Sequence, residues 1–225
     1  MARVSSNTLF NITDSYDYLI DNLKNGIYCQ STFEKLPFGK NGYRVPLISF
    51  CDIPLSLIKE HFDWYGRYGI GIKRSYAREN GVQPVWYVTS ENYLVQKIVK
   101  SPLSEVDRKY ILPYLKQFMG KQKHRSDGIF KMKKFYDERE WRYIPKASIA
   151  EPIFGEQAIK QLATTTPEVH RMEIDLNEVE YIIIEKDKDI LNLIPELKSL
   201  ASAKHVSYEM LLSKIITAKR IEQDF

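Results

Sequence analysis

Short segments rich in β-branched and aromatic residues recur along the chain, and short helical patterns separate them. The opening reads as a strand over residues 9–13, a helix over 15–24 with Asp14 as its N-cap, and a strand over 27–31. Further strands are expected over 45–50, 70–73, 85–88, 135–144, 169–174, 179–184 and 214–217. Because strands and helices do not alternate as in a doubly wound sheet, the pattern predicts a mixed α+β fold.

Helices are expected between these strands. They are expected over residues 52–65, 75–80, 155–163, 187–202 and 207–212. A longer helical stretch over about 90–119 is broken around Pro102 and Pro113. At 225 residues the chain can bury a full core, so we expect one domain over 1–225.

The composition is that of an ordinary soluble protein, with 44% hydrophobic and 28% charged residues. No apolar run approaches the length of a membrane span, and the first residues lack the apolar core of a secretion signal. We therefore expect a cytoplasmic location and no membrane partner. Cys29 and Cys51 have no Cys or His neighbours at metal-ligand spacing, so no metal site is expected.

Positive charge is concentrated between residues 108 and 134, where nine basic residues accompany one acidic residue. Aromatic residues are interleaved among them, a composition typical of a groove for single-stranded nucleic acid. The alternative is a solvated helix face. We expect a basic helical insertion over about 90–134. The candidate nucleic-acid-binding residues are Lys116, Lys121, Lys123, Arg125, Lys131, Lys133 and Lys134.

The strand expected over 135–144 carries two carboxylates on one face. At the two-residue period of a strand, Glu138, Glu140 and Arg142 point one way and Trp141 points the other. Neighbouring carboxylates repel each other, so this arrangement needs a cation, a chemical role or full solvation. The structural alternative is an ion-pair ladder on an exposed edge strand.

Other polar residues could join this pair. Asn11 and Thr13 lie in the first strand, Ser49 lies in the strand over 45–50, and His61 and Tyr65 share a helix face. Each of these residues could instead have a purely structural role, at a strand end, in the core or in side-chain packing. The chain contains no Gly-rich phosphate loop, no G-x-S-x-G elbow and no H-E-x-x-H helix.

The order of several segments resembles the AbiGi-type abortive-infection family of bacterial anti-phage proteins, and is similar to that in DarT-like ADP-ribosyltransferases. The resemblance covers about residues 8–145. The segments that carry it are Leu9–Thr13, Leu19–Gly26, Val45–Pro54, His61–Gly69 and Glu138–Arg142.

The resemblance implies an ADP-ribosyltransferase-like split β-sheet with surrounding helices, and NAD as the substrate. Glu140 would be the catalytic carboxylate and Glu138 would orient or deprotonate the acceptor. Asn11, where the enzymes usually have a histidine, would contact the dinucleotide. The cofactor-binding set is then Asn11, Thr13, Ser49, His61 and Tyr65.

The leading hypothesis is therefore an NAD-dependent ADP-ribosyltransferase toxin of an abortive-infection system, which modifies RNA or DNA and is held inactive by a cognate antitoxin protein. A second hypothesis is a non-catalytic antitoxin or nucleic-acid-binding regulator, because AbiGi proteins have been labelled antitoxins. A third is an NAD glycohydrolase, which would release free ADP-ribose.

Overall fold

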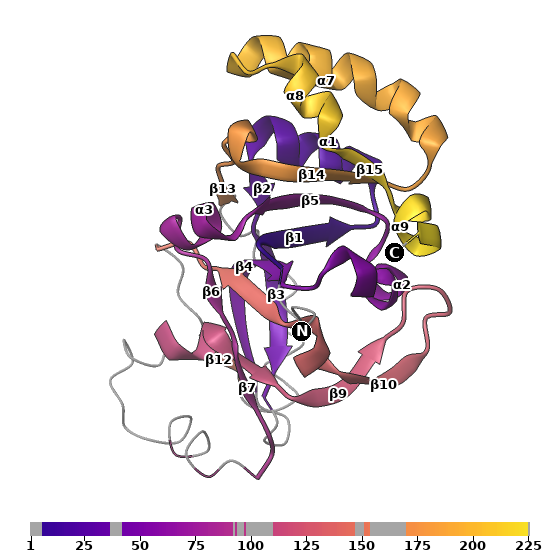
Figure 1. The fold of residues 1–225 in the computed structure, drawn as a ribbon. Helices are drawn as coiled ribbons and strands as arrows, with labels where there is room; N and C mark the ends of the chain where they lie inside the picture. Colours follow the sequence, from indigo (N-terminus) through magenta and orange to yellow (C-terminus); the bar gives the residue numbers. More distant parts are fainter. Residues whose placement is uncertain are drawn as a thin grey trace.

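A computed structural model describes residues 6–36, 42–91, 93, 97, 110–146, 151–153 and 170–224. Within them a mixed sheet runs in the order β15-β14-β5-β1-β4-β11-β6 (Figure 1). Neighbouring strands on this path are antiparallel, except for the parallel pair β14 and β15. The strands are β15 (Ile215–Thr217), β14 (Val179–Ile184), β5 (Tyr68–Lys73), β1 (Thr8–Thr13), β4 (Gly42–Cys51), β11 (Glu140–Tyr143) and β6 (Gln83–Pro84).

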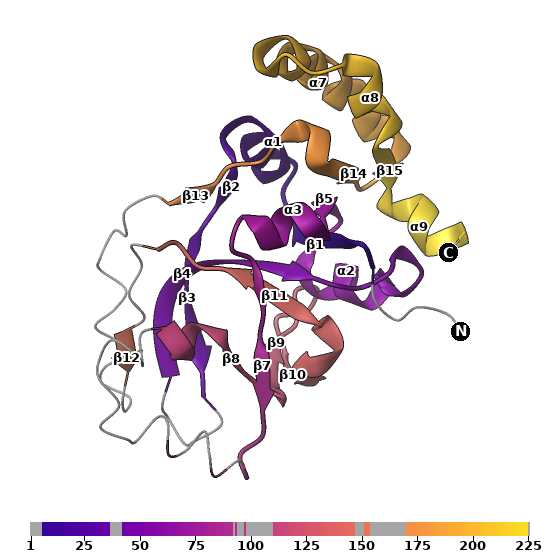
Figure 2. The same cartoon turned by 60° about the vertical axis from the view of Figure 1, so that its left-hand side comes forward.

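Strand β4 changes partners along its length. Its second half pairs with β11, from Ile48 opposite Tyr143 to Cys51 opposite Glu140, and Cys51 also pairs with β1. Its first half pairs with β3 (Gln30–Lys35) and with β12 (Glu151–Ile153). Figure 2 shows β4 running from the central strands to β3. This one strand therefore connects the parts of the sheet that carry the candidate site residues.

Helices cover both faces of the central strands. Successive buried side chains of β14 point to opposite faces, so both faces must be covered. Ile182 and Ile184 belong to the main core, whereas Ile183 belongs to a second cluster on the opposite face. The main core includes residues of α1 (Tyr16–Asn25), α3 (Arg74–Glu79), α7 (Ile190–Lys204) and α8 (Tyr208–Ser213). The second cluster includes residues of α2 (Lys59–Tyr65) and α9 (Ala218–Asp224).

Three two-stranded sheets complete the described part. They pair β2 (Ile27–Tyr28) with β13 (Arg171–Met172), β7 (Trp86–Val88) with β8 (Leu115–Gln117), and β9 (Met119–Lys123) with β10 (Phe130–Lys134). In Figure 1 the β9–β10 hairpin lies at the opposite end of the molecule from α7 and α8.

The α+β class and most expected strands are confirmed. The basic segment is helical at Tyr110 and Ile111, but not from Leu112 onward, where strands were not expected. Residues Leu112–Tyr114 form a 3-10 turn, and β8, β9 and β10 follow. The N-cap of α1 is Ser15, whose side chain accepts a hydrogen bond from the Tyr18 N–H, and not Asp14. The helix expected over 155–163 and most of residues 92–109 lie outside the described residues. No helix in the described ranges is long and apolar enough to cross a membrane.

Gly66 and Gly81 both have a positive φ, but only Gly66 is closely packed. Replacing each by alanine therefore separates the cost of steric overlap from the cost of backbone strain. Gly66, at φ 122°, ends α2, and a Cβ there would overlap the Thr13 carbonyl oxygen. Gly81, at φ 88°, has open space around it. In urea denaturation we expect Gly81→Ala to cost about 1 kcal/mol and Gly66→Ala to cost at least about 3 kcal/mol. Equal losses would contradict the close packing of α2 against β1.

Candidate functional site

A cavity of about 480 Å³ lies among β1, β3, β4, α2 and the segment that precedes β11. Its size is within the range of small-molecule sites. The lining includes every residue predicted as catalytic or cofactor-binding, although these residues come from four separate parts of the chain. They are Asn11, Thr13, Ser49, His61, Tyr65, Glu138 and Glu140.

A change of backbone conformation brings the two glutamates to the same cavity. The expected strand over 135–144 begins only at Glu140, because residues Phe135–Glu138 form a 3-10 turn. Arg139 between them is left-handed, with φ 48° and ψ 49°, a conformation that costs a non-glycine residue about 1 kcal/mol. Glu138 is 5% exposed and Glu140 is 4% exposed, so the exposed ion-pair ladder is wrong.

Both oxygens of the Glu140 carboxylate are fully engaged. Oε1 accepts hydrogen bonds from Ser49 Oγ (2.6 Å) and Arg142 Nε (2.8 Å). Oε2 accepts one from Arg142 Nη2 (3.1 Å) and lies 3.2 Å from Lys116 Nζ. Burial opposes ionisation, but the charges of Arg142 and Lys116 outweigh it and hold the pKa of Glu140 well below its usual value. Glu140 is therefore an anion at pH 7.

Arg142 is 0% exposed and connects several segments. Besides its bonds to Glu140, Nη1 donates to Tyr43 Oη (2.6 Å) and to the Pro113 carbonyl oxygen (2.7 Å). Nη2 also donates to Glu34 Oε2 (2.8 Å). Sequence reasoning placed Arg142 on the right strand face but missed Glu34 and Tyr43, which no local pattern joins to it.

Lys116 lies in the wall of the cavity. Its Nζ is 3.4 Å from Glu34 Oε2 and 3.9 Å from Glu138 Oε2, in addition to its contact with Glu140. Burial opposes its charge, but these three carboxylates raise the pKa of Lys116 well above its usual value. These carboxylates already neutralise the Lys116 charge, and its role in nucleic-acid binding stays a prediction.

Glu138, Tyr65 and Lys133 form a second cluster in the same wall. Lys133 Nζ lies 2.6 Å from Glu138 Oε1, donates to Tyr65 Oη (3.1 Å), and sits over the rings of Trp64 and Tyr65 at 4.4 and 4.2 Å. Tyr65 Oη also donates to Glu138 Oε1. Burial, followed by the Glu138 charge, raises the pKa of Tyr65 well above its usual value. Lys133 is thus buried and already paired with Glu138, and its role in nucleic-acid binding stays a prediction.

The remaining cavity residues differ in how firmly they are held. Asn11 Nδ2 donates to the Ser49 carbonyl oxygen (3.0 Å) and thereby links β1 to β4. Thr13 Oγ1 accepts from the Ser15 N–H at 3.4 Å. The His61 ring centroid lies 4.5 Å from that of Tyr65. Burial, aided by the charge of Lys133, lowers the pKa of His61 to about 3, so its imidazole is neutral at pH 7.

The other basic candidates lie on the β9–β10 hairpin. Lys121, Lys123 and Lys134 are exposed. At the turn, Lys131 Nζ lies 2.6 Å from Asp127 Oδ2, and Arg125 Nε lies 3.9 Å from Asp14 Oδ2. For these five residues, nucleic-acid binding stays a prediction. The expected solvated helix face is replaced by a two-stranded ribbon.

The low pKa of Glu140 predicts a specific pH dependence of stability. An ordinary glutamate titrates near 4.5. The unfolded chain therefore binds a proton below that pH while the folded chain does not, so the stabilisation is present above pH 4.5 and is lost as the pH falls. Glu140→Gln should destabilise the protein by about 2–4 kcal/mol at pH 7. It should also make the acid loss of stability shallower, by up to about 1.4 kcal/mol per pH unit.

Urea denaturation between pH 7 and pH 3 measures both effects. Glu79→Gln removes an exposed carboxylate on α3 and serves as the control. If Glu140→Gln and Glu79→Gln show the same pH dependence, the buried ion pairs of Glu140 do not hold its charge in solution.

Comparison with known proteins relates this chain to abortive phage resistance proteins. The chain is 24% identical over 222 residues to "Abortive phage resistance protein AbiGi" of Lactococcus lactis subsp. cremoris, with 80% of this chain and 89% of that protein covered. No solved structure matches the chain. The AbiGi part of the sequence resemblance is confirmed, whereas the likeness to DarT-like enzymes stays a prediction.

A family profile matches residues 42–185, which include Ser49, His61, Tyr65, Glu138 and Glu140 and begin after β1. With well over half of its length matched, this chain belongs to the family described as "Putative abortive phage resistance protein AbiGi, antitoxin".

Proposed function

We propose that this chain is the antitoxin of an abortive phage resistance system and acts by binding a toxin partner, without catalysis. The observation that carries the proposal is the family match, whose description names an antitoxin. The relative from Lactococcus lactis carries the same AbiGi name. This was the second hypothesis from the sequence, and it now takes precedence over the toxin hypothesis.

The geometry of Glu140 supports a role without catalysis. A carboxylate that assists glycosidic bond cleavage must accept a hydrogen bond from the sugar or meet the positive charge that develops on it. Both oxygens of Glu140 already contact Ser49, Arg142 and Lys116. A bound sugar would have to displace one of these groups from a buried, charge-balanced cluster, which is costly. Glu140 therefore fits a structural cross-link.

NAD cleavage is the second candidate function, and the lining of the cavity favours it. Seven residues selected from the sequence share one cavity of ligand size. Glu138 Oε2 has no described contact closer than Lys116 at 3.9 Å, so it has capacity left for a ligand hydroxyl. The neutral imidazole of His61 lines the same cavity.

In that reaction the bond between the ribose C1′ and the nicotinamide nitrogen breaks, and nicotinamide leaves with the electron pair. An acceptor oxygen or nitrogen then bonds to C1′ and gives its proton to a base, for which Glu138 is the available carboxylate. With a nucleic-acid acceptor the product is ADP-ribosylated RNA or DNA. With water it is free ADP-ribose, as in an NAD glycohydrolase. No metal is required in either case.

Expression in a bacterial host separates the two functions. As an antitoxin, the chain is harmless when it is expressed alone and restores growth when it is co-expressed with the toxin of its system. Glu140→Gln, if it folds, is equally harmless alone. Toxicity of the wild type that Glu140→Gln abolishes would instead favour the enzyme.

Incubation of the purified chain with labelled NAD and RNA or DNA tests directly whether the chain cleaves NAD. If the chain is an antitoxin, we expect neither label transfer nor free ADP-ribose. An enzyme predicts one of them, with a loss of about a hundredfold in Glu138→Gln or Glu140→Gln and none in Glu79→Gln.

A further inference from the structure

One face of the β9–β10 hairpin is exposed along its whole length. In the register of the hairpin, Phe130 lies opposite Lys123, Met132 opposite Lys121, and Lys134 opposite Met119. Phe130 is 65% exposed, Met132 57% and Met119 53%, values unusual for large apolar side chains that neighbour one another. The six residues, called the hairpin face below, are Met119, Lys121, Lys123, Phe130, Met132 and Lys134.

The opposite face of the hairpin is fixed to the body of the protein. The ammonium group of Lys133 in β10 lies over the rings of Trp64 and Tyr65 and contacts Glu138 at 2.6 Å. Gln122 Nε2 of β9 donates to Tyr65 Oη at 3.3 Å. An isolated hairpin is marginally stable in water, so these contacts help to hold it in place, together with the hydrogen bonds of Phe118 to Val88 and Tyr136 at its base. The hairpin face is therefore a preorganised surface.

Charge on the hairpin face is only partly neutralised by the chain itself. Lys134 Nζ lies 3.2 Å from Asp137 Oδ1. Among the described residues, Lys121 and Lys123 make no ion pair. Each of these two lysines stands beside an exposed apolar side chain on the other strand. On the hairpin face, lysines without an ion-pair partner among the described residues thus lie next to exposed apolar side chains, at the distance between neighbouring strands.

We infer that the hairpin face is the docking surface for a toxin segment in which acidic and apolar side chains alternate. This inference rests on the proposed antitoxin role and names where the partner binds. Carboxylates of such a segment pair with the lysines, and its apolar side chains cover Phe130, Met132 and Met119. Interfaces between proteins are enriched in methionine and aromatic residues, and methionine adapts well to a partner's shape.

A single strand of nucleic acid fits the hairpin face less well. Such strands bind where successive bases stack on aromatic rings, whereas Phe130 is the one aromatic among these six residues. Nucleic-acid binding is therefore an outcome that the experiment must distinguish from protein docking.

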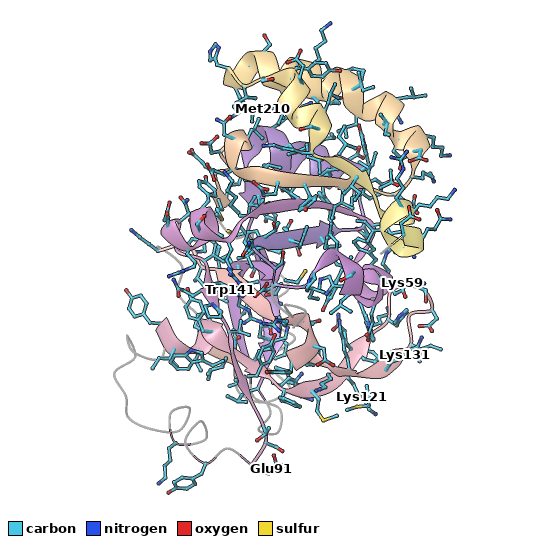
Figure 3. The ribbon with its side chains drawn as sticks, in the orientation of Figure 1. Lys59, Glu91, Lys121, Lys131, Trp141 and Met210 are labelled. Atoms are coloured by element: carbon cyan, nitrogen blue, oxygen red, sulfur yellow. The ribbon has the colours of Figure 1, made fainter. Side chains whose placement is uncertain are left out.

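The test reverses charge on the hairpin face of the full chain. The test variant combines Lys121→Glu, Lys123→Glu and Lys134→Glu. The matched control combines Lys198→Glu, Lys204→Glu and Lys219→Glu, which changes the charge equally at exposed sites on α7 and α9. Figure 3 labels Lys121 on the hairpin, far from Met210 on α8 beside α7. Circular dichroism and urea denaturation verify that both variants fold.

Rescue of growth from the co-expressed toxin, and affinity for the purified toxin, are the readouts. We expect the hairpin variant to bind at least about tenfold more weakly and to lose rescue, while the control behaves as the wild type. A second variant, Phe130→Ser with Met132→Ser, should weaken binding with the lysines intact. Labelled oligo-dT and oligo-rU serve as nucleic-acid probes.

Two results would overturn the inference while the antitoxin role stands. One is full rescue by both hairpin variants. The other is oligonucleotide binding that depends on these lysines while toxin binding does not. If the wild-type chain itself gives no rescue, the proposed antitoxin role fails, and this outcome is separate from the first two.

Discussion

The fully buried guanidinium of Arg142 is the constraint on which the rest of the site depends. A buried charge without partners is too costly for a folded protein, so two carboxylates and further acceptors must accompany it. Glu34 from β3 and Glu140 from β11 provide the charge, and Tyr43 and the Pro113 carbonyl accept the remaining hydrogen bonds. Because these groups come from distant segments, their pairing fixes β3, β4, β11 and the segment before β8 relative to one another.

A second buried ion pair, between Lys133 and Glu138, links the cavity wall to the hairpin. Lys133 satisfies Glu138 inside the cavity wall and at the same time anchors β10 to α2 through the rings of Trp64 and Tyr65. A change in the cavity that disturbs Glu138 would therefore loosen the hairpin as well. One buried lysine therefore contacts both the wall of the ligand-sized cavity and the helix against which the hairpin lies.

Local patterns predicted much of the fold because they depend on neighbouring residues alone. The β-branched run over 179–184 and the helical pattern over 15–24 are signals of this kind. The face shared by Glu140 and Arg142 was also predictable from the two-residue period. The selected cavity residues do converge, but their chemical roles are not tested by this convergence.

Other features depended on contacts that no local pattern reveals. The left-handed Arg139 replaces the expected strand with a turn, and nothing in its side chain favours that conformation. Lys116 and Lys133 belong to a basic run, yet they are buried because Glu34, Glu138 and Glu140 lie opposite them in space. The local pattern of this basic run predicts a helix, although over residues 119–134 the lysines and apolar residues pair across a hairpin.

The central claim is that Glu140 and Arg142 form a closed structural cross-link, and a double-mutant cycle tests it most directly. Urea denaturation at pH 7 of the wild type, Glu140→Gln, Arg142→Met and the double variant gives their coupling free energy. The account predicts a coupling of at least about 2 kcal/mol, because either single variant removes the bidentate partner of a buried charge and leaves it only one weaker or more distant counter-charge. A coupling within about 0.5 kcal/mol of zero would contradict it, since the two side chains would then contribute independently.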